Sequence, residues 1–433
     1  MVADRTRASA HKALDQWREQ ATRLHKTGDA AGALAALRRW VSLDPLNEDA
    51  QRELIWMLAL NGQRTTALAQ YAWCQRILAE QLGAAPEPAT TRLYERIRDA
   101  EHHTNLPPQP VPLVGREAEL AEIVRLLHHP QIRVISLVGM GGIGKTRLAL
   151  EAAHATEKHL LHGAYAAFLT SITTINGLYA AVSETFGGLS SGSGDLRATL
   201  LDYLRDKHLL LVLDNVEQVI EPAAQFVGEA TRAAPDVKIL VTSRERLNIT
   251  AEWLIPLEGL PCYSEDGNPE RSPAAQLFWL VTQRVRGDGT ASPSERAAVG
   301  HIGVMTGGLP LAIELAASWM RLLSAEEVAR QIETNVAFLE ASTRDVAARH
   351  RSLRAVFDHS WALLTEQERD GLRKLSVFRG GFDKDAAEHI AGITLPLLYG
   401  LVDKSMVRRA GEGRWDLHDM TREYCAEQLA ISE

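Results

Sequence analysis

The stretch that decides the fold is GMGGIGKTRLAL, which runs from Gly139 to Leu150. The apolar run RVISLV precedes it, and an alanine-rich helical pattern follows it. Four glycines stand within six residues, so the main chain can curl around a ligand without side chains in the way. The stretch matches G-x-x-x-x-G-K-[ST], in which backbone N–H groups surround phosphate oxygens. Strand, loop and helix together favour a phosphate-binding loop over a plain glycine turn.

The residues of this loop have separate expected roles. Lys145 brings a positive charge to the β- and γ-phosphates of a nucleotide, and the hydroxyl of Thr146 holds Mg²⁺. We therefore expect ATP or ADP and Mg²⁺ as cofactors. The residues expected to bind the nucleotide here are Gly139, Gly141, Gly142, Ile143, Gly144, Lys145, Thr146 and Arg147.

The segment HLLLVLDNVEQV supplies the second part of the expected site. Asp214 follows a run of apolar residues, at the end of a buried strand, where ligands bind in open parallel sheets. We expect Asp214 to orient Mg²⁺, directly or through water. The next residue is Asn215, which cannot act as a base, and the orientation of Glu217 is left open by the sequence. The sequence therefore predicts slow hydrolysis.

The segment VKILVTSRERL places Arg244 at the end of another strand. An arginine there can contact a γ-phosphate, whereas the alternative is an exposed arginine at a strand end. With the loop and Asp214 in place we favour the first. The candidate catalytic residues are thus Lys145, Asp214 and Arg244, and the candidate metal ligands are Thr146 and Asp214.

The pattern around this site predicts a multidomain α and α/β protein. Four apolar runs, RVISLVG, AYAAFLT, LLLVLDN and VKILVTS, alternate with helical stretches, as in a parallel sheet with helices on both faces. From about residue 270 helical segments follow, such as SPAAQLFWLVTQRVR. From about 350 helices, a hairpin in SMVRRAGEGRWDLH and a closing helix fit a winged-helix domain.

The first hundred residues contain a repeat. LHKTGDAAGALAAL, from Leu24, aligns with LALNGQRTTALAQY, from Leu58, at the 34-residue spacing of tetratricopeptide repeats. Four prolines between residues 107 and 112 then predict a stiff linker. We expect a tetratricopeptide-like helical domain at 1–104, a linker at 105–112, a phosphate-loop α/β domain at 113–265, a helical subdomain at 266–348 and a winged-helix domain at 349–433.

Composition narrows the classes of partner. The net charge is −8, so the chain as a whole does not attract nucleic acid or anionic lipid. The N-terminal residues lack the apolar centre of a signal peptide, and apolar runs are too short to span a membrane. Three scattered cysteines indicate a reducing compartment. We expect a cytoplasmic protein without a membrane partner.

Six motifs in this order resemble the NB-ARC ATPases of the STAND class of signalling proteins, and most closely their bacterial branch in AfsR-like and LuxR-like regulators. The motifs are LVGREAEL, GMGGIGKT, LLLVLDN, ILVTSR, GGLPLAIELAA and LHDM, and they cover roughly residues 110 to 430. The N-terminal repeats resemble the bacterial transcriptional activation domain that precedes this ATPase in AfsR-like proteins.

The resemblance implies further roles. Val114, Gly115 and Arg116 would lie beside the adenine and ribose, and Pro310 would pack on the adenine. His418, in the Leu-His-Asp form of the usual Met-His-Asp triplet, would reach the β-phosphate of ADP from the winged-helix domain. ADP would keep that domain closed as a lid, and ATP would open it for self-assembly or for a signalling partner.

Two departures from AfsR-like proteins leave alternatives open. Those proteins carry a DNA-binding domain before the activation domain, and MVADRTRASAHKALDQW is too short to hold one. Large relatives also carry a C-terminal repeat sensor, so the sequence is either a piece of a longer chain or a compact member. A DNA-binding transcriptional regulator controlled by the ATPase is the alternative function. A continuously working ATPase is disfavoured by Asn215.

Overall fold

The N-terminal part of the chain is helical. A computed structural model describes residues 16–189, 195–286, 291–334, 339 and 352–432. Gly28 and Gly62, with φ of +82° and +71°, make the turns within two helix pairs, and this confirms the repeat. Ala33 and Ala67 are fully buried where the paired helices pack closely. The N-terminal helical domain consists of a helix at 16–26, α2 (Ala30–Leu43), α3 (Glu48–Leu60), α4 (Arg64–Leu82) and α5 (Pro88–Arg98).

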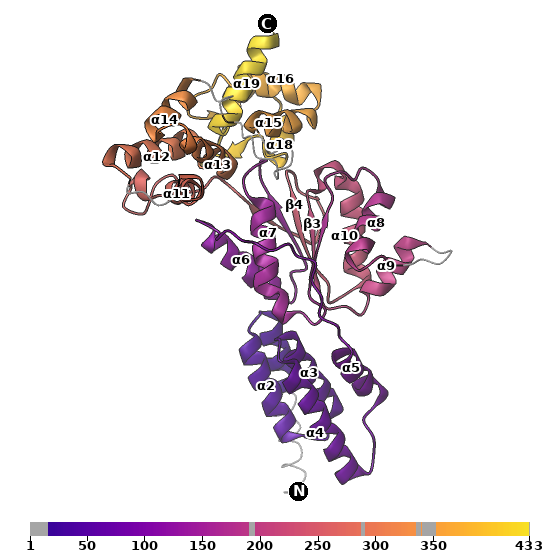
Figure 1. Ribbon diagram of the computed structural model, residues 1–433. Coiled ribbons are helices and arrows are strands. Elements are labelled where there is room, and N and C mark those ends of the chain that lie inside the picture. Colours follow the sequence, from indigo (N-terminus) through magenta and orange to yellow (C-terminus); the bar gives the residue numbers. More distant parts are fainter. Residues whose placement is uncertain (1–15, 190–194, 287–290, 335–338, 340–351, 433) are drawn as a thin grey trace.

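A parallel sheet forms the middle of the molecule (Figure 1). Its strands run in the order β2-β3-β4-β1-β5. The four predicted strands are confirmed, whereas the edge strand β5 was missed because its exposed Trp253 and Leu254 break the pattern of a buried strand. The strands are β1 (Val134–Val138), β2 (Ala164–Phe168), β3 (Leu210–Asp214), β4 (Lys238–Ser243) and β5 (Glu252–Pro256).

Helices cover both faces of this sheet, as the sequence predicted (Figure 1). Leu210 and Val212 of β3 pack towards α7, whereas Leu211 and Leu213 pack towards α8 and α10, because successive side chains of a strand point to opposite faces. We call this part the sheet domain. Its helices are α6 (Glu117–His128), α7 (Lys145–Thr156), η1 (Glu157–His159), α8 (Ile175–Thr185), α9 (Leu196–Leu204), η2 (Val216–Gln218) and α10 (Ile220–Ala233).

Two helical units follow the sheet domain. The helical subdomain comprises η3 (Pro269–Arg271), α11 (Pro273–Arg286), α12 (Pro293–Met305), α13 (Pro310–Ser318), η4 (Trp319–Arg321) and α14 (Ala325–Thr334). The C-terminal domain comprises α15 (Leu353–Ala362), α16 (Glu366–Leu375), β6 (Phe382–Asp383), α17 (Lys384–His389), α18 (Leu395–Asp403), β7 (Arg408–Arg409), β8 (Arg414–Asp416) and α19 (Asp419–Ser432). Its antiparallel sheet has the order β6-β8-β7, which confirms the expected hairpin.

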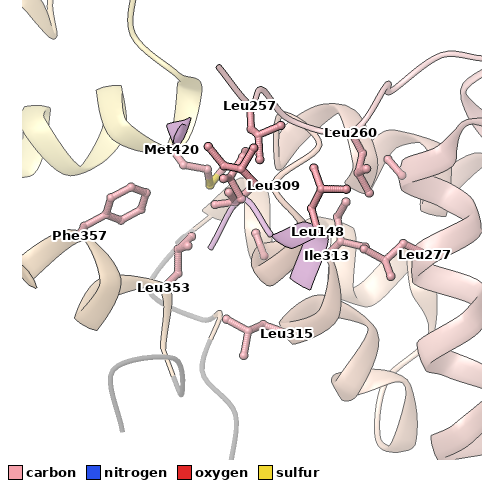
Figure 2. Packing of buried hydrophobic residues seen from close by; sticks show 14 of the residues in the cluster. Leu148, Leu257, Leu260, Leu277, Leu309, Ile313, Leu315, Leu353, Phe357 and Met420 are labelled. Atoms are coloured by element: carbon pink, nitrogen blue, oxygen red, sulfur yellow. The ribbon is translucent and has the colours of Figure 1, made fainter. Parts of the chain in front are cut away.

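One apolar core joins the sheet domain, the helical subdomain and the C-terminal domain. Figure 2 shows part of it, with Leu148 of α7, Ile313 of α13 and Phe357 of α15 among the packed side chains. The opposite face of the sheet and the N-terminal helical domain have separate cores. Opening the C-terminal domain would therefore expose apolar surface that the closed arrangement buries.

The proline-rich segment lies against the sheet domain. Asn105 Nδ2 donates to the carbonyl of Ala166 at 3.0 Å, and the N–H of Ala166 donates back to Asn105 Oδ1 at 2.7 Å. His154 of α7 bonds the carbonyl of Pro107 at 3.0 Å. The segment thus covers the open edge of β2, which would otherwise present unpaired backbone groups. Among the described residues, no helix is long and apolar enough to cross a membrane.

Candidate nucleotide site

A pocket of about 270 Å³ opens at the end of the sheet where the predicted motifs meet. The segment before α6, the loop between β1 and α7, the ends of β3 and β4, and helices α11 and α13 form its walls. It brings together most of the predicted site. The predicted residues that line it are Val114, Arg116, Gly141, Gly142, Ile143, Gly144, Lys145, Thr146, Arg147, Arg244 and Pro310.

The loop before α7 requires its glycines. Gly142 and Gly144 have φ of +78° and +96°, which side chains strongly disfavour. A Cβ atom at Gly142 would also lie 2.9 Å from the Cβ of Leu311, so a larger residue would push α13 away. Lys145 Nζ donates to the carbonyls of Gly139 at 2.7 Å and Met140 at 3.0 Å. Burial lowers the pKa of Lys145 to about 8, although nearby carboxylates oppose the shift.

Asp214 accepts hydrogen bonds from the hydroxyls of two threonines that line the pocket. Thr146 Oγ1 and Thr242 Oγ1 each donate to Asp214 Oδ1 at 2.6 Å. Strand β4 separates β1 from β3, so the ends of all three strands meet here. Burial raises the pKa of Asp214, while the two hydrogen bonds and Lys145 oppose this.

The oxygens of Thr146 and Asp214 fit Mg²⁺, which prefers hard oxygen ligands. Within the described part of the chain, no group of three His, Cys, Asp or Glu side chains could hold a metal alone. Thr146 and Asp214 would thus hold the ion together with a bound nucleotide, whose phosphate charge it would offset.

Arg244 connects the pocket to the C-terminal domain. Its Nε lies 3.1 Å from Glu217 Oε1, and both residues are buried. Its Nη1 donates to the hydroxyl of Ser360 and, at 3.4 Å, to the carbonyl of Val356, both in α15. Ser405 donates in turn to the carbonyl of Arg244 at 2.6 Å. One guanidinium thus contacts a pocket carboxylate and the neighbouring domain.

The sequence left the orientation of Glu217 open, and in the structure Glu217 lines the pocket. Its Oε2 is buried and has no hydrogen-bond partner among the described residues. Asn215 also lines the pocket, with φ of +65°, a conformation that asparagine tolerates better than most residues. The backbone N–H of Asn215 donates to Thr242 Oγ1 at 2.9 Å, which fixes the strand end.

One part of the pocket has apolar walls that the sequence did not reveal. Leu113, Leu260, Leu277 and Leu311 line it together with Pro310. Leucines also fill ordinary cores, so in the sequence only the proline of the GGLPL motif could have indicated this pocket wall.

Two residues of the LVGREAEL motif support the pocket in different ways. Arg116 is buried, pairs with Glu119 at 2.7 Å and donates to the carbonyls of Glu258 and, at 3.4 Å, Ile143. It therefore ties the loop after β1 to the segment after β5. Gly115 does not line the pocket, and a Cβ atom there would lie 2.4 Å from Pro273.

His418 lies outside the pocket wall. Its Nε2 bonds the carbonyl of Gly307 at 3.1 Å, three residues before Pro310. His418 and Gly139 line a neighbouring cavity on the other side of the phosphate loop. In this arrangement His418 holds the C-terminal domain to the helical subdomain, and its implied contact with a β-phosphate stays a prediction.

The strand order, the loop after β1 and the aspartate at the end of β3 define the sheet domain as that of a P-loop nucleotide-binding protein. Comparisons with known proteins agree. The model of the bacterial transcriptional activator domain matches residues 1–98, and that of the NB-ARC domain matches residues 116–252.

Relatives extend the match over most of the chain. The uncharacterized protein Rv0894 of Mycobacterium tuberculosis is 30% identical over 337 residues, which cover 74% of this chain and 81% of that protein. Regulatory protein AfsR of Streptomyces griseus is 27% identical over 458 residues, which cover 96% of this chain and 45% of AfsR. Mycobacterial relatives that are 35% identical match over only 34% of their own length, so the chain spans about a third of them.

Among solved structures, a STAND protein with a tetratricopeptide repeat sensor from Pyrococcus horikoshii is 18% identical, with a TM-score of 0.35. The match covers 74% of this chain and 43% of that one. The chain belongs to the AfsR-like proteins that join a bacterial transcriptional activator domain to an NB-ARC domain.

Proposed function

We propose that the protein is a slow ATP- and ADP-dependent switch in which the C-terminal domain is the lid. The observation that carries this proposal is the double engagement of Arg244. It pairs with Glu217 in the nucleotide pocket and donates to Ser360 of α15 at the same time.

Only a triphosphate competes for that arginine. A γ-phosphate beside Lys145 and Thr146 would offer Arg244 a stronger, charge-assisted acceptor than the Ser360 hydroxyl. Arg244 would then leave α15, and the lid would lose a buried contact. ADP has no γ-phosphate and leaves the contact in place. This difference between two nucleotides is the differential affinity that a switch requires.

Other contacts hold the lid in the ADP state. Arg246 pairs with Asp403 at 3.4 Å, and Ser405 donates to the carbonyl of Arg244. His418 bonds Gly307 beside the base-binding end of the pocket. Sheet domain, helical subdomain and lid thus meet around the nucleotide, and exchange of ADP for ATP would release them for self-assembly or for a partner.

Slow hydrolysis follows from the carboxylates of the pocket. Asn215 cannot accept a proton from water, whereas the carboxylate of Glu217, which also lines the pocket, can. Its pairing with Arg244 restrains it while the lid is closed. Thr146 and Asp214 are the residues that would hold Mg²⁺, and the ion would offset the negative charge of the phosphates.

We assign the C-terminal domain to the winged-helix class from its helices and its antiparallel sheet. In that class, α18 would take the place of the DNA-reading helix. Its sequence LPLLYGLVD contains no basic residue, and Leu395 and Tyr399 are exposed on it. A helix of this kind suits protein contacts better than phosphates. This favours the switch over DNA binding through this domain.

The test compares ADP-loaded and ATPγS-loaded protein, both with Mg²⁺, by sedimentation velocity and by protease cleavage of the lid. We expect ATPγS to change the sedimentation coefficient or to accelerate cleavage, and Arg244→Gln to abolish the difference between nucleotides. Ser376→Ala is the control, because Ser376 bonds Arg373 within the lid itself. Identical behaviour of the wild type with both nucleotides would contradict the switch.

A further inference from the structure

A second cavity lies on the other side of the phosphate loop from the nucleotide pocket. Its volume is about 330 Å³, within the range of ligand sites in proteins. Its walls are mostly apolar. Leu254 and Leu257 line one side, and Val402, Met406 and Val407 line the other.

The two sides of this cavity belong to different domains. Val138, Gly139 and Met140 come from β1 and the phosphate loop, and Leu254 comes from β5. Val402 to Arg409 come from α18 and the segment that leads to the hairpin of the lid. The cavity therefore exists only while the lid is closed on the sheet domain.

His418, which lines the cavity, has a buried ring nitrogen without a hydrogen-bond partner among the described residues. His418 is 7% exposed, and its Nε2 must carry the proton because the Gly307 carbonyl can only accept. Its Nδ1 is then an acceptor, and no described residue donates to it. A buried acceptor without a donor costs about 1–3 kcal/mol, which a ligand that donates a hydrogen bond would recover.

The charges of the lining are positive on balance. Arg246, Arg408 and Arg409 line the cavity with Glu258 and Asp403. Arg246 is paired with Asp403, and Arg408 is paired with Asp416 at 3.3 Å. Arg409 is exposed and forms no ion pair with any residue that the structure describes. Its Nε donates to the carbonyl of Gly411 at 3.4 Å. An anionic group at this edge would therefore find a cation whose charge is not paired with a carboxylate of the described residues.

We propose that this cavity is a binding site for a small apolar anion with a hydrogen-bond donor. The apolar body fills the space between Leu254 and Val402, the donor reaches His418 Nδ1, and the anionic group lies beside Arg409. Such a ligand joins the sheet domain to the lid and, by mass action, favours the closed arrangement. This regulatory consequence rests on the proposed switch, whereas the binding site does not.

The probe is 8-anilinonaphthalene-1-sulfonate, which has an apolar ring system, an N–H donor and one sulfonate. It is titrated by fluorescence against protein saturated with ADP, so that the nucleotide pocket is occupied. ADP binding is measured separately on each sample by calorimetry, and its failure would count against the proposed function alone.

Three variants locate the bound probe. Leu254→Trp fills the cavity. Trp253→Leu is the control, because it changes the preceding residue of β5, which does not line the cavity. Arg409→Glu reverses the charge of an exposed residue that forms no ion pair among the described residues. We expect one saturable probe per chain, weakened at least tenfold by Leu254→Trp, about fivefold by Arg409→Glu and less than twofold by Trp253→Leu.

Weak, non-saturable fluorescence in the wild type would overturn the proposal. So would equal binding by the wild type, Leu254→Trp and Arg409→Glu. If Leu254→Trp fails to bind ADP and is misfolded, the comparison of Arg409→Glu with the wild type decides the outcome.

Discussion

Removal of the Ser360 hydroxyl should loosen the lid without touching the nucleotide pocket. In the closed arrangement this hydroxyl accepts from Arg244 Nη1, and it lies in α15, outside the pocket lining. We therefore expect Ser360→Ala to leave the pocket intact and to release ADP faster.

The size of the effect follows from the contacts that remain. A hydrogen bond to a charged group contributes about 1.5–3 kcal/mol. In the variant, Arg244 keeps Glu217 at 3.1 Å and the carbonyl of Val356 at 3.4 Å, so the loss should lie near the lower limit. About 1.4 kcal/mol is a tenfold change in an equilibrium. If ADP leaves only from the open state, its dissociation should be about tenfold faster.

The assay is stopped-flow dissociation of a fluorescent ADP analogue, chased with excess ADP. Ser376→Ala is the matched control, because it removes a hydroxyl that bonds within the lid. An unchanged rate for Ser360→Ala, or equal acceleration by both variants, would refute the assignment of Arg244 as the contact that holds the lid.

Three further outcomes are expected. Because the pKa of Lys145 is about 8 and phosphate binds its charged form, ADP affinity should fall as pH rises above 8. A constant ADP affinity from pH 7 to 9.5, measured by calorimetry, would count against this role of Lys145. Glu217→Gln should slow ATP hydrolysis about 100-fold if Glu217 is the base, and unchanged single-turnover rates would exclude that role. His162 and His208 have pKa values of about 4 and about 3 because burial disfavours their charged forms. Below about pH 6.5 the unfolded chain therefore binds more protons than the folded chain. The free energy of unfolding should then fall by about 1.4 kcal/mol for each of the two histidines and each pH unit below that value. Denaturant melts with equal midpoints at pH 5.5 and 7.5 would be inconsistent with this expectation.

The local signals in the sequence were sufficient for much of the fold. Gly28 and Gly62 marked turns that need a positive φ, and both occupy them. The loop from Gly139 to Thr146 was predictable because phosphate binding constrains adjacent residues. The strand β3 was recognisable because it is buried on both faces and is therefore apolar up to its last residue, Asp214.

Long-range packing explains what the sequence did not reveal. Strand β5 pairs only with β1 and leaves Trp253 exposed, so no apolar run marked it. Asn105 covers the edge of β2 through two hydrogen bonds to a residue 61 positions away, so the segment expected to be a stiff linker also docks on the sheet domain. The partner of Arg244 in α15 lies 116 positions along the chain. No local spacing encodes such contacts.

The nucleotide that stays bound after purification tests the central claim most directly. The protein would be denatured, and the released nucleotide would be identified and quantified by chromatography. A slow switch with a closed lid predicts close to one ADP per chain. A site that is empty after purification and that turns over ATP rapidly in steady state would contradict the account, because a nucleotide that leaves freely cannot hold the lid.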